Sequence, residues 1–189
     1  MMDTLNNIWN HLNEKGQGSD KGSVHSYLDT YEKLLAPYKE SNKILEIGIF
    51  NGHSLRMWEY YFYNAEVYGV DCSDTPLDGM ADLRPMIAEG THDILIFDAT
   101  SEAQVKKHFE GMQFNVIIDD AAHSREQQLQ LYSLYKHYMA PGGIYIIEDI
   151  QDIDSDRAHF ENIDPEKSVE IIDLRSVKSR YDDVIVVIK

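Results

Sequence analysis

The chain is poor in cysteine and in basic residues, and each shortage narrows the functions open to it. Its 189 residues include one cysteine, Cys72, so no disulfide can form within the chain, which fits a reducing compartment. Lysine and arginine number 17 against 33 aspartates and glutamates, which gives a formal net charge of -16. A field of that sign repels nucleic-acid phosphates, so we expect no nucleic-acid partner.

Long apolar runs are also missing. No stretch approaches the roughly 18 consecutive apolar residues that a membrane helix needs, so we expect no membrane partner. The first residues, MMDTLNNIWNHLNEKG, lack the basic flank and apolar segment of a secretory signal. These features predict a cytoplasmic protein with one domain, residues 1–189, divided into an N-terminal helical segment (1–40) and an α/β core (41–189).

Two kinds of pattern follow one another along the chain. Residues 3–13 and 24–35 carry apolar side chains at helical spacing, and the second stretch ends near Pro37. From residue 43, short apolar runs alternate with helical stretches, which predicts a parallel sheet covered on both faces. The predicted strands are 43–49, 66–70, 93–98, 114–119 and 144–149, and the predicted helices are 53–62, 78–88, 101–110 and 124–139.

Two proline-containing segments and the tail complete the prediction. We expect Pro85 to interrupt the helix at 78–88, and residues 141–143 (Pro-Gly-Gly) to form a turn. Residues 168–174 and 183–189 read as an antiparallel strand pair joined by a polar, basic loop. A five-stranded α/β core closed by such a pair resembles the Rossmann-like fold of class I methyltransferases. The resemblance implies the sheet order 3-2-1-4-5-7-6, with strand 7 antiparallel.

The loop after the first strand predicts a nucleoside-type cofactor. It carries the pattern E-x-G-x-x-x-G, with Phe50 where the dinucleotide motif G-x-G-x-x-G needs its second glycine. A pyrophosphate would lose close backbone approach there, whereas S-adenosylmethionine carries no phosphate. Acids end the next two strands, where Asp71 can accept hydrogen bonds from ribose hydroxyls and Asp98 can reach an adenine amino group. The candidate cofactor residues in and after these strands are Glu46, Gly48, Asn51, Gly52, Ser54, Asp71, Cys72, Asp98, Ala99 and Asp119.

A second group of acids follows the fourth and fifth strands. Asp120, Glu148 and Asp149 offer hard oxygen ligands that suit Mg²⁺, with Mn²⁺ or Ca²⁺ as substitutes. His123 lies three residues after Asp120 and suits a general base for a hydroxyl acceptor, so Asp120 and His123 are the candidate catalytic residues. Acidic strand ends also serve as helix caps, and a lone histidine is often structural. Convergence of four ionisable side chains on one edge of the sheet favours a site.

Several segments together are similar to a more specific family. IIDDAAH, GGIYIIEDI, GSDKGSVHSYLDTYEKLL and SRYDDVIVVIK resemble the metal-dependent sugar O-methyltransferases of the macrocin and mycinamicin type, and the cephalosporin-hydroxylase-like group. This resemblance implies methyl transfer from S-adenosylmethionine to a sugar hydroxyl, with metal ligands at Asp120, Glu148 and Asp149 and a base at His123. It also implies that the cofactor or substrate lies under residues of the N-terminal segment, namely Lys21, Gly22, His25 and Tyr27.

The chain departs from that family in length, which leaves the acceptor open. Modest loops after strands 2 and 5 favour a small acceptor, either a nucleotide-linked deoxysugar or a glycoside. Arg175, Lys178 and Arg180 either meet a substrate phosphate or form a solvated loop. A homo-oligomer is expected from the resemblance alone. The alternatives are a catechol-type O-methyltransferase and a non-catalytic cofactor-binding scaffold. An NAD-dependent oxidoreductase is disfavoured by the missing glycine and by the lack of a Tyr-x-x-x-Lys pair.

Overall fold

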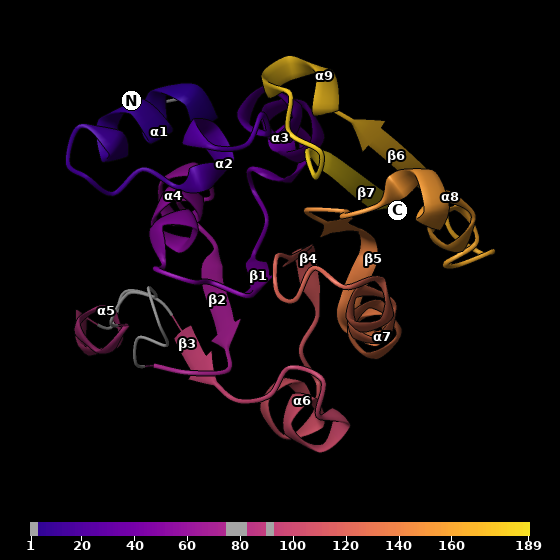
Figure 1. The fold of residues 1–189 in the computed structure, drawn as a ribbon. Helices are drawn as coiled ribbons and strands as arrows, with labels where there is room; N and C mark the ends of the chain where they lie inside the picture. Colours follow the sequence, from indigo (N-terminus) through magenta and orange to yellow (C-terminus); the bar gives the residue numbers. More distant parts are fainter. Residues whose placement is uncertain (1–3, 75–82, 90–92) are drawn as a thin grey trace.

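A seven-stranded mixed sheet with helices on both faces forms the centre of the computed structural model, which describes residues 4–74, 83–89 and 93–189 (Figure 1). The strand order is β3-β2-β1-β4-β5-β7-β6. The first five strands pair in parallel, and β7 runs antiparallel to both of its neighbours. The predicted fold class and strand order are therefore confirmed. The strands are β1 (Lys43–Ile47), β2 (Glu66–Asp71), β3 (Asp93–Ile96), β4 (Phe114–Asp119), β5 (Met139–Ile147), β6 (Val169–Asp173) and β7 (Val184–Ile188).

The helices precede and alternate with the strands. They are α1 (Leu5–Asn13), α2 (Asp20–Ser23), α3 (Leu28–Leu35), α4 (His53–Tyr61), α5 (Arg84–Glu89), α6 (Glu102–Phe109), α7 (Arg125–Tyr135), α8 (Ile153–Glu161) and α9 (Arg175–Lys178). Short 3₁₀ turns, η1 (Ala36–Tyr38) and η2 (Lys136–Tyr138), follow α3 and α7. In the part of the chain that the structure describes, none of these helices combines the length and the apolar character needed to cross a bilayer.

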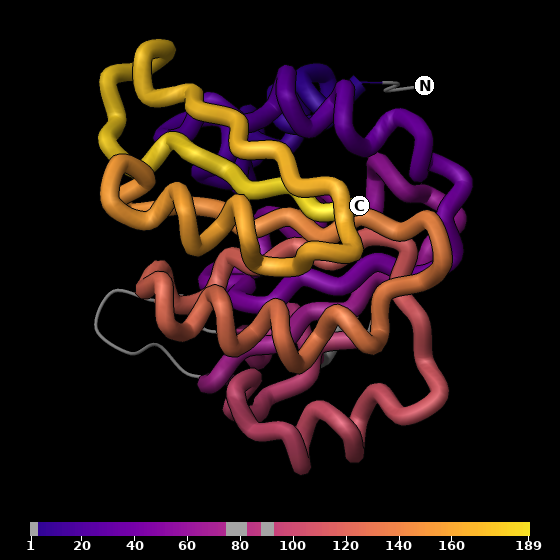
Figure 2. The backbone as a smooth tube through the Cα atoms, turned by 90° about the vertical axis from the view of Figure 1, so that its right-hand side faces the viewer, coloured from indigo at the N-terminus to yellow at the C-terminus, as the bar shows by residue number. Residues whose placement is uncertain are grey.

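Alternating side chains of the strands divide the interior into two apolar cores. In β1, Ile44 faces one core while Leu45 and Ile47 face the other, because successive residues of a strand point to opposite sides. The first core is closed by α1, α3 and α4, and the second by α6, α7 and α8. Figure 2 shows α6, α7 and α8, the helices that close the second core, in front of the strands. The N-terminal helices thus share a core with the sheet.

The structure differs from the predicted elements in several places. The predicted helix 24–35 begins at Leu28. Pro85 lies in the first turn of α5, where a proline is tolerated, and residues 78–82 of the predicted helix lie outside the described residues, so the expected interruption stays a prediction. The expected turn at 141–143 is a bulged part of β5, since Phe114 pairs with Met139 and Val116 with Ile144. Helix α8, capped by Asp152, was not predicted.

The strand register gathers several chain segments at one edge of the sheet. Ile47 pairs with Asp119, and Asp119 pairs with Ile147, so the loops after β1, β4 and β5 leave the sheet side by side. Between β1 and β4 the order of strands reverses, which is where open α/β sheets bind ligands. Because β7 is antiparallel, Asp182 and Asp183, just before it, reach the same edge.

Candidate functional site

The loop after β1 approaches its neighbours so closely that it requires a glycine. Gly48 has φ +83°, and a Cβ atom there would lie 2.2 Å from the backbone oxygen of Asp120. Asp71 fixes the next two residues, because its Oδ2 accepts hydrogen bonds from the backbone N–H groups of Ile49 (3.0 Å) and Phe50 (3.2 Å). The loop is therefore held between the ends of β2 and β4.

Asp71 also holds its own strand end. Its Oδ1 accepts hydrogen bonds from the backbone of Cys72 (2.7 Å) and Ser73 (3.4 Å). A carboxylate has about four acceptor positions. The four backbone N–H groups named above already occupy two positions on each oxygen of Asp71. The role of Asp71 toward a ribose stays a prediction, and the structure adds that this acid orders the loop.

A cavity of about 500 Å³ opens beside this loop. That volume lies within the range of small-molecule sites in proteins. One part is lined by the predicted nucleoside residues and the other by the predicted catalytic residues, so the two groups share one space. The lining residues are Asp20, Ile47, Gly48, Phe50, Val70, Asp71, Cys72, Asp98, Ala99, Thr100, Asp120, Ala121, Ala122, His123, Gln127, Leu131 and Asp149.

Some lining residues were missed from the sequence. Gln127 and Leu131 lie on one face of α7, at i+4 and i+8 from His123, and that spacing could have indicated them. Asp20 adjoins Lys21 in the short helix α2, but the sequence gives no signal that distinguishes it from a solvated loop acid.

Several predicted cofactor residues lie outside the lining that the described residues form. Ser54 donates a hydrogen bond to buried Glu46 (2.7 Å), and Asn51 accepts one from the backbone of His53 (3.1 Å). Asp119 accepts a hydrogen bond from the backbone of Ala121 (3.3 Å), and burial raises its pKa to about 8. The predicted site residues that are not part of this lining are Lys21, Tyr27, Glu46, Asn51, Gly52, Ser54, Asp119 and Glu148.

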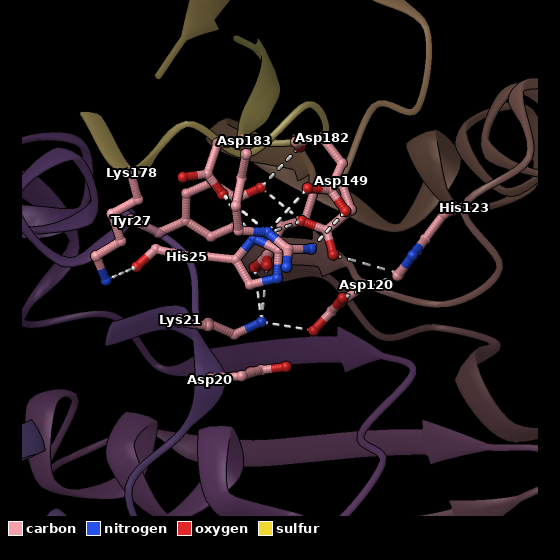
Figure 3. A network of polar contacts seen from close by, with 12 residues as sticks. Asp20, Lys21, His25, Tyr27, Asp120, His123, Asp149, Lys178, Asp182 and Asp183 are labelled. Carbon is pink, nitrogen blue, oxygen red and sulfur yellow. Dashed lines mark hydrogen bonds and ion pairs between the residues drawn. The ribbon is translucent and has the colours of Figure 1, made fainter. Parts of the chain in front are cut away.

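Asp120, His123 and Asp149 meet at the cavity wall (Figure 3). His123 Nε2 lies 3.4 Å from Asp120 Oδ1 and 3.7 Å from Asp149 Oδ2. The hydrogen bond with Asp120 raises the pKa of His123, and the charge of Asp149 adds to this. Asp149 adopts φ +56°, a conformation that is strained for a residue with a side chain and that recurs at functional sites.

Lys21 reaches the same acids from the interior. Its Nζ lies 2.6 Å from Asp120 Oδ2, 2.8 Å from Glu148 Oε1 and 3.3 Å from Glu46 Oε1. Burial alone would lower the pKa of Lys21, but the carboxylates of Asp120, Glu148 and Glu46 hold it well above its usual value. The surrounding carboxylates therefore favour the charged, ammonium form of the side chain.

Three more side chains of the N-terminal segment hold the acids. Tyr27 donates a hydrogen bond to Asp149 (2.5 Å), and Tyr31 donates one to Glu148. His25 Nδ1 lies 2.7 Å from Asp183 Oδ1 and 3.3 Å from Asp149 Oδ1. Residues that precede the α/β core in the sequence thus complete the acidic edge of the sheet.

The basic residues of the C-terminal connection contact this chain itself. Arg175 pairs with Asp173 and Asp154, and Arg180 pairs with Asp182. Lys178 donates to the backbone oxygens of residues 22, 23 and 25. All three side chains are engaged within the fold, which argues against a ready-made phosphate site here.

The donor atoms fit a divalent cation on the cavity side. One ligand atom each from Asp120, His123 and Asp149 lie within 4.8 Å of one another, and the same holds for Glu46, Asp120 and Glu148. The second set surrounds Lys21 Nζ, whereas the first set lines the cavity. Carboxylate oxygens are the ligands that Mg²⁺ and Mn²⁺ prefer. The predicted trio of Asp120, Glu148 and Asp149 is thus divided between the two sets.

A Rossmann-like sheet with a cavity at its switch point is the usual architecture of an α/β ligand-binding protein, and comparison gives the family. A family model described as a methyltransferase domain matches residues 45–150. The chain belongs to this methyltransferase-domain family.

Curated relatives agree with the predicted resemblance. An 8-demethyl-8-alpha-L-rhamnosyl tetracenomycin-C 2'-O-methyltransferase of Streptomyces olivaceus is 29% identical over 71% of this chain and 35% of its own length. A demethylmacrocin O-methyltransferase of Streptomyces fradiae is 27% identical over 68% of this chain and 33% of its own length. The chain thus spans about a third of the curated relatives that it matches.

Solved structures agree in fold. The MycE methyltransferase of the mycinamycin biosynthetic pathway, in complex with Mg and SAH, superposes with a TM-score of 0.72 at 17% identity, covering 96% of this chain and 54% of MycE. A putative caffeoyl-CoA O-methyltransferase from Staphylococcus aureus gives a TM-score of 0.61 at 16% identity, covering 85% and 81%.

Proposed function

We propose that this protein is an S-adenosylmethionine-dependent O-methyltransferase that methylates a sugar hydroxyl with the help of a divalent metal. The observation that carries the proposal is that one cavity joins the nucleoside residues after β1–β3 to Asp120, His123 and Asp149. Catalysis of methyl transfer needs the donor and the acceptor oxygen held in line, and a shared cavity brings the two subsites within reach of each other.

The nucleoside part of the cavity takes the cofactor. Gly48 allows close backbone approach, Asp98 lies at the end of β3, and Cys72 and Ala99 complete this part of the wall. The relatives named above are O-methyltransferases, and MycE was crystallised with SAH, which supports S-adenosylmethionine as the donor.

The acidic part of the cavity activates the acceptor. S-adenosylmethionine supplies a methyl group on a sulfonium, and a divalent cation supplies positive charge that lowers the pKa of a nearby hydroxyl. Asp120 and Asp149 would hold such a cation with the oxygens that face His123. His123 takes the hydroxyl proton as the oxygen bonds to the methyl carbon and the carbon–sulfur bond breaks, leaving S-adenosylhomocysteine.

A neutral glycoside is the favoured acceptor. Arg175, Lys178 and Arg180 are bound to acids and carbonyls of this chain, so a nucleotide-linked sugar would have to displace those contacts. The names of the curated relatives point the same way, since they methylate sugar-bearing compounds.

Calorimetry with S-adenosylhomocysteine tests the cofactor site. We expect micromolar binding to the wild type and roughly tenfold weaker binding to Asp98→Ala, which loses an acceptor at the cavity wall. Asp93→Ala changes the same residue type at the opposite end of β3 and is the matched control. If Asp98→Ala bound S-adenosylhomocysteine as tightly as Asp93→Ala, Asp98 would not be part of the cofactor site. Absence of binding by the wild type would contradict the proposed function.

An acceptor panel tests the chemistry. Labelled S-adenosylmethionine is incubated with glycosides, a nucleotide sugar and a catechol, with Mg²⁺ or with a chelator. Transfer to a glycoside that stops with the chelator is the expected result. Transfer to the catechol alone would establish the phenol-methylating alternative, and cofactor binding without transfer to any acceptor would favour a scaffold.

A further inference from the structure

Lys21 is a fully buried lysine at the centre of the acidic edge. Only 1% of its surface is exposed, and three carboxylates surround its ammonium. Two of these, Glu46 and Glu148, are themselves 0% and 1% exposed. Charged groups are almost never buried so completely unless they neutralise one another.

Asp120 connects this ammonium to the cavity. Its Oδ2 accepts a hydrogen bond from Lys21, while its Oδ1 lies 3.4 Å from His123 Nε2 on the cavity side. Three groups of potential metal ligands lie among the described residues, and two of them, Glu46/Asp120/Glu148 and Asp120/His123/Asp149, share this one residue, whereas the third is His25/Asp182/Asp183. The carboxylate therefore has one oxygen directed at each group.

We propose that Lys21 is a built-in cation that permanently fills the inner of two cation positions bridged by Asp120, leaving the outer position to a single divalent metal. The inner position consists of Glu46, Asp120 and Glu148, and the outer one of the Asp120 and Asp149 oxygens that face His123. This inference rests on the metal of the proposed function. It assigns Lys21 and Glu148 to positioning Asp120 instead of to binding cofactor or metal.

The surroundings of Lys21 keep it in place. Its helix is capped by Ser19, whose backbone oxygen accepts a hydrogen bond from Trp9 Nε1 (2.6 Å). Lys178 donates to the backbone oxygens of Gly22, Ser23 and His25 on the other side. These contacts fix the backbone of Lys21 beside the three acids, and the ion pairs of its Nζ hold the side chain.

The remaining oxygens of the inner position indicate that it suits a cation. Glu148 Oε1 accepts a hydrogen bond from Tyr31, and both Glu148 oxygens lie within 2.9 Å of Lys21 Nζ. Among the described residues, buried Glu46 Oε1 has no hydrogen-bond partner, and its contact is the ion pair with Lys21 at 3.3 Å. Removing the ammonium would leave three buried carboxyl groups, whose charge either a metal cation or protonation would have to neutralise.

Manganese binding to Lys21→Met tests the proposal. By calorimetry and electron paramagnetic resonance, we expect the wild type to bind one Mn²⁺ per chain and Lys21→Met to bind a second. Saturating Mn²⁺ should raise the Tm of the variant by about 5–10 °C more than that of the wild type. Lys136→Met, which removes a lysine paired with Asp164, is the matched control and should bind metal like the wild type.

Binding stoichiometry separates this inference from the proposed function. A variant with the stoichiometry, affinity and Tm response of the wild type would overturn it, because Lys21 would then only fill space. A wild type that binds no metal beside a variant that binds one would uphold the inner position and remove the metal from the proposed function.

A measurement on the wild type covers the case in which Lys21→Met does not fold. The side-chain ammonium of a buried, ion-paired lysine gives a distinct ¹⁵N resonance, assigned through Lys21→Arg. We expect this resonance to persist and shift when Mg²⁺ saturates the protein. Its loss on addition of Mg²⁺ would show that the metal displaces the ammonium, and the proposal would fail.

Discussion

At the scale of single residues, Gly48 bears the tightest steric demand of the site. Gly48→Ala places a Cβ 2.2 Å from the Asp120 oxygen and 2.5 Å from the Ala121 Cα. Both are backbone atoms, which cannot move away without shifting the loop after β4. We expect a loss of more than about 2 kcal/mol in the free energy of unfolding and at least tenfold weaker S-adenosylhomocysteine binding.

Gly111→Ala is the control for this substitution. Gly111 has nearly the same φ, +82°, but nothing lies within 4 Å of an added Cβ. It should lose only about 1–2 kcal/mol, the cost of a left-handed residue, and keep full binding. Urea unfolding and calorimetry measure both variants. Equal effects of the two substitutions would show that the close approach at Gly48 is unimportant.

Substitution of His123 should distinguish an effect on catalysis from an effect on cofactor binding. His123→Gln should lower kcat by roughly 10²–10⁴-fold, because the acceptor hydroxyl loses its base, while S-adenosylhomocysteine binding changes little. His137→Gln, an exposed histidine in η2, is the control and should leave the kinetics unchanged. Steady-state kinetics and calorimetry on the two variants provide the test. A kcat within threefold of the wild type would exclude His123 as the base.

At the scale of elements, Asp164 joins α7 to the segment that follows α8. Its carboxylate accepts hydrogen bonds from Tyr132 (2.9 Å), Lys136 (3.1 Å) and the backbone of Glu166 (3.0 Å). Burial alone would raise its pKa, but the hydrogen bonds outweigh burial and lower it below the usual value. This stabilisation is therefore complete above the unfolded pKa, near 4, and disappears as the pH falls through the lower folded pKa.

Asp164→Asn should make that pH dependence visible. We expect a loss of about 1–3 kcal/mol at neutral pH, with a difference from the wild type that shrinks only below about pH 4. Asp154→Asn alters an exposed ion pair with Arg175 and should cost a few tenths of a kcal/mol. Urea unfolding across pH gives both curves. A constant difference between wild type and Asp164→Asn down to about pH 2 would contradict the assignment.

The sequence predicts the sheet better than the connections. Strands that are apolar on both faces, such as β4, leave a clear pattern, and the acids at their ends follow from it. Helix α8 leaves little apolar pattern in the sequence, because only Ile153 and Phe160 of its nine residues are buried. Similarly, local spacing cannot reveal that Lys21, 99 residues before Asp120, pairs with it, since only the folded chain brings them together.

At the scale of the whole molecule, the net charge of -16 complicates every metal experiment. Acids outnumber basic residues nearly two to one, so like charges repel in the folded state, and any salt that screens them stabilises it. Mg²⁺ added as chloride acts both as a screening ion and as a ligand. Rising stability with Mg²⁺ is therefore not by itself a sign of a site.

A comparison at matched ionic strength separates the two effects. With NaCl, we expect the Tm to rise gradually, without saturation at low millimolar salt, because screening depends on ionic strength alone. With MgCl₂, an additional rise should saturate as the outer position fills, following the logarithm of one plus the ratio of free metal to Kd. Asp149→Asn keeps a side chain that tolerates the +56° φ but removes one ligand charge, so it should lose the saturating part and keep the gradual one. Superimposed MgCl₂ and NaCl curves for the wild type would mean that the acidic edge holds no specific metal.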